Sequence, residues 1–402
     1  MKLFRRILII LFLIIILIYV TNITQMPDSI ILFKGEKLNL FTVLGIFIKE
    51  NQEDYRAVQA SSTINGNAIE TKTVSISLFN FIDVKDIEIN TIPKATVVPL
   101  GNTIGLKLYS SGVLVIGMTE IEGRKPYKDS GIEEGDLIVE IDNKQISTTE
   151  ELVECVNSSN GQTLEITYVR DGNEYNTNIE PIETSNNEYK LGLWVRDGAA
   201  GVGTITYYEP STKSFAALGH GIVDSDTSKL ISIASGELVT TSISSIVKGK
   251  ENEPGEIRGT IKNQEAIGEI SSNTEFGIYG KLNNISLLNS NQTEYEVATR
   301  DEIKVGEAKI ILTLEDGIRK EYDMEVEKIY RNNNSDNKSM LIKVVDEELL
   351  NLTGGIIQGM SGAPIVQNGK FIGAVTHVLV SDPTTGYAIF GDLMIKEMRE
   401  VK

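Results

Sequence analysis

The sequence has 402 residues and a formal net charge of −18, and its apolar content is ordinary for a globular protein. The length suggests two or three domains, and the acidity argues against a nucleic-acid partner, because a phosphate backbone would be repelled. The only cysteine, Cys155, excludes an intrachain disulfide. It lies on the apolar face of a predicted capped helix over 148–156, which indicates a buried structural thiol.

The N-terminus combines positive charge with an apolar run. Lys2, Arg5 and Arg6 precede an unbroken apolar stretch of 14 residues, Ile7 to Val20. A spanning helix needs about 20 residues, so a cleaved signal peptide is the alternative. Flanking residues can extend the stretch, however, and no small-x-small cleavage site follows it. We predict an uncleaved signal anchor over residues 1–23, which inserts in the membrane and leaves the remaining chain on the extracytoplasmic side.

Residues 24–95 mix apolar and polar stretches and contain no recognisable chemistry. The segment Val74–Phe79 alternates between apolar and polar residues, so we predict a strand there. We expect the whole region to be an extracytoplasmic linker between the anchor and the folded domains.

Residues 96–183 have the pattern of a small α+β domain, with a strand at 112–117, the Cys155 helix and an Asp171-Gly172 hairpin. Between the strand and the helix lies Ser130-Gly131-Ile132-Glu133-Glu134-Gly135-Asp136-Leu137-Ile138. This segment resembles the signature of PDZ domains.

PDZ domains bind peptide C-termini or internal strands by adding a strand to a sheet edge. The resemblance therefore implies that a PDZ-bound peptide or protein tail is a partner. It also implies a peptide-binding loop upstream of the 112–117 strand, at Ile104, Gly105 and Leu106. The alternative is a simple glycine turn between two strands.

Residues 189–402 are rich in short β patterns separated by turns. Ala308–Leu314, an Asp316-Gly317 turn and Ile318–Val326 form a hairpin pattern, and Met340–Val345 is a predicted strand. Strands at this spacing, with few long helices, indicate a β-barrel or sandwich. The size suits the paired barrels of a trypsin-like peptidase.

The segment Gly359-Met360-Ser361-Gly362-Ala363-Pro364 is the strongest chemical signal in the chain. A strand, an Asn368-Gly369 turn and a second strand follow it, which is how trypsin-like folds present a nucleophile. We predict Ser361 as that nucleophile. Glycines let such a turn direct main-chain N–H groups at an oxyanion, and the N–H groups of Gly359 and Ser361 are the expected donors.

A serine hydroxyl needs a base, and the chain has only two histidines. His220 lies in a Gly-His-Gly turn and precedes the serine, as in trypsin-like enzymes, so we predict it as the base. His377 follows the strand after Ser361 and could contact substrate instead.

The third member of a triad would orient the imidazole and stabilise its charged form. Asp224 and Asp226 are close to His220 in sequence, and Asp323 lies in a strand pattern. Asp346 ends an apolar strand 15 residues before Ser361. The residues alone leave these four candidates open.

The anchor, the PDZ pattern, Gly219-His220-Gly221-Ile222-x-Asp224 and the glycine-framed Ser361 motif together resemble the stage IV sporulation protein B family. These are signalling serine peptidases of endospore-forming bacteria. The resemblance implies a triad of His220, Asp346 and Ser361. Ala363 departs from the serine that is common in the family at that place, which is not a triad position.

The resemblance also implies a role. Members of the family lie in the space between the two forespore membranes. There they cleave a regulatory partner protein, which triggers processing of a late mother-cell sigma factor. They also cleave their own N-terminal region. Protein substrates and this N-terminal region are therefore the expected partners.

We thus predict a mainly β protein with an N-terminal anchor helix, a PDZ domain and a trypsin-like double β-barrel peptidase domain. The alternative function is a non-catalytic PDZ scaffold whose peptidase-like domain docks partner proteins. An intramembrane metallopeptidase is excluded for two reasons. The sequence has no His-Glu-x-x-His motif, and it has only one predicted membrane segment. No nucleotide-binding loop or cluster of metal ligands is evident, so we expect no cofactor.

Overall fold

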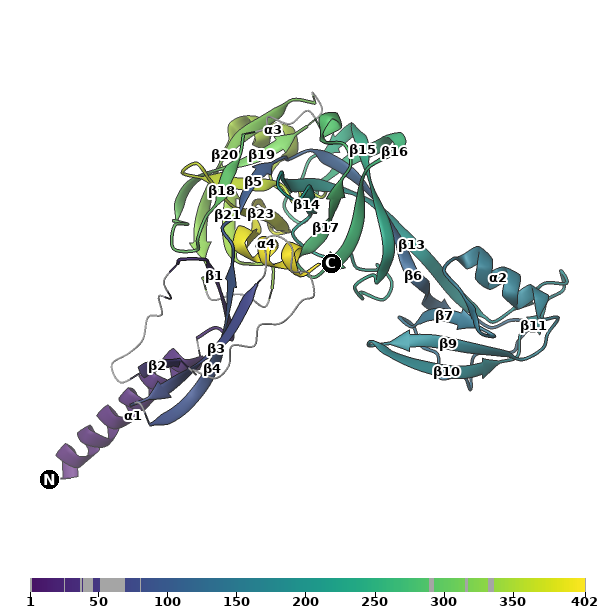
Figure 1. Cartoon of the computed structure of the whole chain (residues 1–402), viewed down its shortest axis with the longest axis horizontal. Helices are drawn as coiled ribbons and strands as arrows, with labels where there is room; N and C mark the ends of the chain where they lie inside the picture. The colour runs from purple at the N-terminus through teal and green to yellow at the C-terminus, as the bar shows by residue number, and fades with distance from the viewer. Residues whose placement is uncertain are drawn as a thin grey trace.

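The computed structural model shows a mainly β protein with an N-terminal helix (Figure 1). The structure describes residues 2–24, 26–36, 38, 46–50, 69–79, 81–288, 293–314, 317–331 and 336–401.

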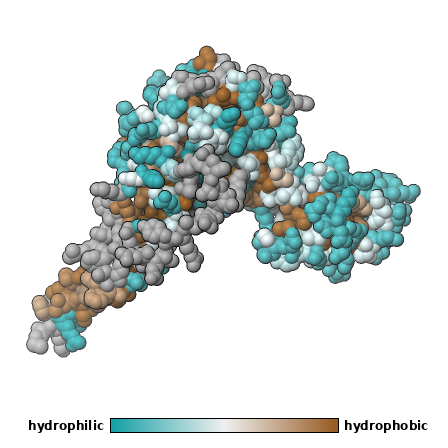
Figure 2. All heavy atoms as spheres, viewed as in Figure 1, coloured by the Kyte–Doolittle hydropathy of each residue, from teal (hydrophilic) through white to brown (hydrophobic). Residues whose placement is uncertain are grey.

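Helix α1 (Lys2–Thr24) is mostly exposed and mostly apolar, and the view in Figure 2 shows apolar surface along it. Its stretch Phe4–Thr21 has a mean hydropathy of 2.5 and is 0% buried. These properties fit a membrane-spanning helix or a signal sequence.

The region predicted as a linker contains a small sheet with the strand order β1-β4-β3-β2. The strands are β1 (Ser29–Phe33), β2 (Ile46–Glu50), β3 (Glu70–Leu78) and β4 (Ile82–Ile92). Buried Val74, Ile76, Ile87 and Ile89 form its core. The predicted strand at 74–79 corresponds to the second half of β3, where Val74, Ile76 and Leu78 alternate with serines.

The first of two barrels is a closed ring of six strands within the described residues. In ring order these are β6 (Thr103–Met118), β13 (Leu193–Glu209), β14 (Ser214–Ala217), β17 (Gly277–Leu282), β16 (Glu256–Thr274) and β15 (Ile233–Val247). Its core consists mainly of buried aliphatic side chains, with Phe215 at the centre.

The second barrel is also a ring of six described strands. In ring order these are β19 (Gly306–Thr313), β20 (Arg319–Ile329), β21 (Met340–Val344), β24 (Asp382–Phe390), β23 (Lys370–Leu379) and β22 (Pro364–Gln367). The expected β19–β20 and β22–β23 hairpins are confirmed, although Asp316 of the first turn lies outside the described residues. Asn368 and Gly369 both have positive φ, as a tight hairpin turn requires.

Short elements connect and cover the barrels. Strand β5 (Thr96–Pro99) pairs with β13 of the first barrel and with β18 (Tyr295–Val297), which continues onto β23 of the second. A 3-10 turn, η1 (Ile285–Leu288), precedes β18, and helix α3 (Glu347–Thr353) follows β21. The final helix, α4 (Gly391–Glu400), packs on β23 and β14, so it contacts both barrels.

The PDZ-like unit is inserted between the first two strands of the first barrel and projects from it (Figure 1). The outer half of β6 continues into its sheet and pairs with β7. The other elements are β7 (Leu137–Ile141), β8 (Lys144–Gln145), α2 (Thr149–Ser158), β9 (Leu164–Arg170), β10 (Asn173–Ile179), β11 (Ile182–Glu183) and β12 (Tyr189–Lys190). Helix α2 has the expected capping box, in which Thr148 and Glu151 cap each other's backbone N–H groups. Cys155 is only half-buried against the core of the unit.

This insertion corrects the prediction of a peptide-binding loop at Ile104, Gly105 and Leu106. All three residues are buried in the first barrel, where β6 pairs with β13 on one side and with β15 on the other. Peptide addition needs an open strand edge, and these residues have none. Residues 103–109, which lie within the range predicted for the PDZ domain, form a strand of the first barrel.

A buried ion pair fastens α4 to the first barrel. Arg399 donates to the Oε1 atom of Glu209 over 2.6 Å, and the two side chains are only 5% and 3% exposed. Thr212 donates its hydroxyl to the other Glu209 oxygen. Breaking such a pair from one side leaves a buried charge without its partner.

We expect Arg399→Met to lower the free energy of unfolding by about 3–5 kcal/mol, because it strands the Glu209 carboxylate. Urea denaturation followed by circular dichroism measures this loss. The double variant Glu209→Gln/Arg399→Met removes both charges and should recover part of it. Equal losses in the single and the double variant would show that packing, not charge, dominates here.

Candidate active site

Ser361 lies in a tight turn that leads from α3 into β22. Gly359 and Gly362 on either side have φ of +96° and +94°, a region that favours glycine. A Cβ at Gly362 would lie 2.2 Å from the Thr204 carbonyl oxygen and 2.4 Å from the Leu218 nitrogen. The Ser361 turn of the second barrel thus packs directly on the first barrel. There the Ser361 carbonyl accepts a hydrogen bond from the Thr204 N–H over 3.1 Å.

His220 lies in the loop between β14 and β15 of the first barrel. Gly219, with φ of +70°, brings the loop against β23, since a Cβ there would lie 3.0 Å from Thr376 Cγ2. The His220 Nδ1 atom is 2.9 Å from the Gly221 carbonyl oxygen. A carbonyl only accepts, so Nδ1 carries the proton and Nε2 presents a lone pair.

The Ser361 turn and the His220 loop meet at Thr376. The Ser361 hydroxyl donates to the Thr376 carbonyl over 3.0 Å, and a Cβ added at Gly219, the residue before His220, would lie 3.0 Å from the Thr376 methyl group. The Ser361 turn of the second barrel and the His220 loop of the first barrel therefore lie close together. In the part of the chain that the structure describes, the hydroxyl hydrogen bonds this carbonyl and not the His220 ring.

Two peptide groups of the turn are fixed through their carbonyls. The Gln358 carbonyl accepts from Ile257 N–H over 2.8 Å, and the Met360 carbonyl accepts from Ala363 N–H over 2.9 Å. In a trans peptide group the N–H of the following residue points in the direction opposite to the carbonyl. The N–H groups of Gly359 and Ser361 are thereby directed away from these partners, and neither donates to an acceptor among the described residues. Both remain available for an oxyanion.

The second histidine, His377, follows Thr376 on β23. Its ring centroid is 5.4 Å from that of His220. Partial burial lowers the pKa of His377 to about 4, with a further contribution from the charge of the neighbouring His220. Burial also lowers the pKa of His220, against the hydrogen bond to Gly221, which acts to raise it. Both rings are therefore neutral at neutral pH, the state that a general base needs.

Asp346 caps helix α3 in this structure. Its Oδ1 accepts from Leu349 N–H over 3.0 Å, and its Oδ2 accepts from Asp323 N–H over 3.1 Å. No hydrogen bond to His220 from this carboxylate is present among the described residues. The role of Asp346 in orienting His220 stays a prediction.

The three other candidate aspartates also have different partners. Asp224 and Asp226 bind Arg196, and Asp323 pairs with Lys309 over 2.8 Å. Within the described chain, the Gly221 carbonyl is what holds the His220 ring.

Sequence analysis missed the residues that support the site. Thr204 donates its hydroxyl to the Gly359 carbonyl over 2.7 Å, and buried Thr376 receives the Ser361 hydroxyl. Asn273 on β16 holds the His220 loop through hydrogen bonds of 2.8, 2.8 and 2.9 Å to the backbone of Ile222 and Ile231. No local pattern marks these residues, because each acts on a segment distant in sequence.

We expect the His377 ring to titrate near pH 4 and the His220 ring below its ordinary 6.5. Unfolded His377 binds its proton nearer 6.5, so the unfolded state holds more protons between pH 6.5 and 4. Stability should therefore fall as the pH is lowered through this window. NMR titration of the imidazole carbons measures both values, and His377→Asn assigns the two signals. Titration of His377 near 6.5 would contradict the described packing.

The comparison with solved structures matches, among others, the PDZ domains of SdrC-like proteins from Listeria monocytogenes and Listeria innocua. They are 23% and 22% identical, each covers 21% of this chain and 87% and 93% of its own, and both TM-scores are 0.19. The HtrA-type protease AlgW, solved with a decapeptide, is 12% identical over 51% of this chain and 54% of its own, with a TM-score of 0.30. The comparison with curated proteins gives no match.

Family models give the assignment. A PDZ domain model matches residues 95–180. The model described as SpoIVB peptidase S55 matches residues 187–395, which is more than half of the chain and includes both His220 and Ser361. This chain therefore belongs to the SpoIVB peptidase S55 family and is a PDZ-containing serine peptidase.

Proposed function

We propose that this peptidase is a membrane-tethered endopeptidase that cleaves its own N-terminal region and a regulatory partner protein during sporulation. Cleavage of the partner triggers processing of a late mother-cell sigma factor. Family membership supports this role. The observation that carries the chemistry is the meeting of the Ser361 turn and the His220 loop on Thr376, beside two free N–H groups.

In the proposed reaction the Ser361 hydroxyl turns from the Thr376 carbonyl toward His220 and attacks the scissile carbonyl. His220 Nε2 takes the proton and later gives it to the leaving amine. The N–H groups of Gly359 and Ser361 stabilise the oxyanion, and loss of one such donor typically costs about 10²–10³ in kcat. Water then attacks the acyl carbonyl. His220 takes a proton from this water and gives it to the Ser361 oxygen as the acyl group is released.

Helix α1 supports the tether, and the charges before its apolar stretch favour an N-terminus in the cytoplasm. The peptidase would then act on the extracytoplasmic side, in the space between the forespore membranes. The partner protein and the anchor-proximal region are substrates that reach the same compartment.

A non-catalytic docking role is the second candidate, and two contacts favour it. The Ser361 hydroxyl is bonded to a backbone carbonyl, and the Asp346 carboxylate is occupied as a helix cap. An active site in this arrangement has to rearrange before it reacts, whereas a scaffold would not.

Self-cleavage separates the two functions. We expect the full-length chain in detergent micelles to release N-terminal fragments, and Ser361→Ala to release none, because loss of the nucleophile costs about 10⁶ in rate. Mass spectrometry identifies the fragments and the cleavage sites. Ser211→Ala, in an exposed turn, is the matched serine control and should cleave normally. Equal cleavage by wild type and Ser361→Ala, or none by either, would favour the scaffold.

Asp346→Asn tests the triad assignment. Asparagine caps helices as well as aspartate does, so the fold should be kept while the negative charge is lost. If Asp346 orients His220 during the reaction, the rate of self-cleavage should drop by about 10⁴. The melting temperature checks that the α3 cap is intact. An unchanged rate would remove Asp346 from the mechanism and leave the Gly221 carbonyl as the group that orients His220.

A further inference from the structure

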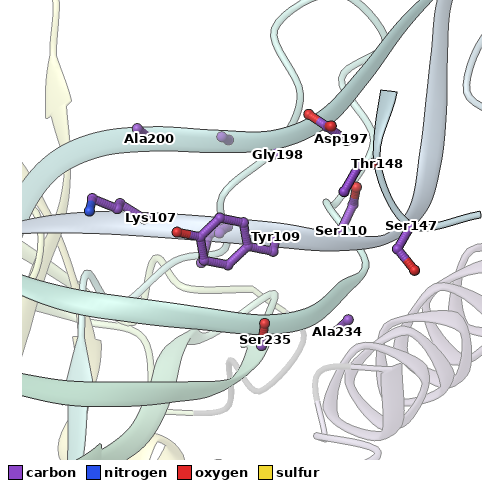
Figure 3. Close-up of a pocket in the computed structure, with 12 residues that line it drawn as sticks. Lys107, Tyr109, Ser110, Ser147, Thr148, Asp197, Gly198, Ala200, Ala234 and Ser235 are labelled. Carbon is purple, nitrogen blue, oxygen red and sulfur yellow. The ribbon is translucent and has the colours of Figure 1, made fainter. Parts of the chain in front are cut away.

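The strands that connect the PDZ unit to the barrel contain a pronounced bulge. Arg196 of β13 is paired with Leu114 of β6, but Gly198 is paired with Tyr109. Asp197 alone therefore stands opposite residues 110–113. Figure 3 shows Asp197 and Gly198 on one strand beside Tyr109 and Ser110 on the next. These residues line a pocket of about 600 Å³. Bulges bend a strand pair, so the PDZ unit begins at a bend.

Arg196, on the PDZ side of this bend, reaches the loop that carries His220. Its guanidinium bonds the carboxylate of Asp224 and, over 2.9 Å, that of Asp226. The Asp224 side chain is 0% exposed. It also accepts from Asp226 N–H, Thr227 N–H and the Thr227 hydroxyl over 3.0, 2.9 and 3.1 Å.

Asp224 remains charged in this environment. Burial acts to raise its pKa, but the hydrogen bonds from Thr227 and Asp226 and the charge of Arg196 lower it below the ordinary value. A buried carboxylate depends on such partners, and removal of one is costly. Arg196 is the only one of these partners that lies outside the His220 loop.

The His220 loop is thus held from two sides. Asn273 fixes Ile222 and Ile231 on the barrel side, and Arg196 fixes Asp224 on the PDZ side. Asp224 is four residues after His220. A shift of the Asp224 turn therefore moves the base relative to Ser361.

The neighbouring residue links the same strand to the PDZ helix. The Asp197 carboxylate accepts the Thr149 N–H in the first turn of α2 over 2.7 Å. Successive strand residues point to opposite faces, so β13 contacts α2 through Asp197 and the His220 loop through Arg196. The loop touches the PDZ unit again at Lys229, which lies against Gly135 and 3.9 Å from Asp171.

We propose that Arg196 is a positioning residue for His220, and that Arg196 and Asp197 together couple PDZ helix α2 to the catalytic histidine loop. This inference rests on the proposed peptidase function. When α2 is displaced, β13 turns at the bulge, the Arg196–Asp224 contact weakens, and His220 leaves its position opposite Ser361.

The test is a double-mutant cycle on the full-length chain, with Arg196→Met, Asp224→Asn and the double variant. The rate of self-cleavage should fall about 10–100-fold in Arg196→Met, the size of effect that a small misplacement of a catalytic group produces. Arg196→Met should cost clearly less when Asp224 is already Asn, because the two residues act through each other. Arg196→Lys keeps the charge but not the fork over two carboxylates, so it should recover part of the rate.

A peptide substrate that spans the mapped self-cleavage site gives the second readout. Arg196 does not touch the Ser361 turn, so kcat should fall while KM changes little. The acid limb of the pH profile, which reports His220, should also move. Lys125→Met removes a surface ion pair of the PDZ unit and is the matched control. It should leave kcat, KM and the pH profile unchanged.

Hydrogen exchange makes the coupling testable without activity. In Ser361→Ala, the amides of Asp226 and Thr227 should exchange at least tenfold faster when Arg196→Met is added. Fluorescence of Trp194, the only tryptophan and 62% exposed on β13, should change as well.

Failure of wild type to cleave overturns the peptidase function but leaves this exchange test intact. Equal rates, pH profiles and exchange in wild type, Arg196→Met and Arg196→Lys overturn the coupling. If Arg196→Met does not fold, Arg196→Lys alone decides between these results.

Discussion

The whole active site depends on how closely the Ser361 turn approaches the first barrel. The contact at Gly362 leaves no space for a side chain, and its φ of +94° suits glycine alone. This contact fixes the Ser361 carbonyl on Thr204 and sets the turn beside Leu218, two residues before His220. Neither barrel contains a complete site. The close backbone contact at Gly362 helps to bring the serine turn and the histidine loop together.

Charge pairs then hold the arrangement from its edges. Arg399 joins α4 to the end of β13, and Arg196 joins the PDZ end of the same strand to the His220 loop. Strand β13 therefore takes part in an arginine–carboxylate pair near each end and carries Thr204 between them. A long strand with such contacts is suited to transmit a displacement, because it is stiff along its axis while the bulge in its pairing with β6 allows bending.

The sequence predicted the local features of the fold. The glycines around Ser361, the Asn368-Gly369 turn and the Thr148 cap each depend on a few consecutive residues. The insertion of the PDZ unit could not be predicted, since the alternation of apolar and polar residues in β6 does not indicate which strands pair with it on either side. Asp346 shows the same ambiguity. An aspartate after a strand and before Glu-Glu-Leu-Leu satisfies the pattern of a helix cap and that of a triad member equally well. Only the positions of distant segments distinguish them.

The position of the PDZ unit between β6 and β13 has a consequence for how the protein is made. The two strands pair along much of their length, yet the whole PDZ segment separates them in the chain. The first barrel cannot close until that segment has been synthesised, because β13 follows it in the chain, and an unfolded loop of this length adds an entropic cost to closure. The nascent chain therefore completes its interaction module before its hydrolytic centre. The Ser361 turn and the His220 loop therefore cannot meet while the polypeptide is still emerging.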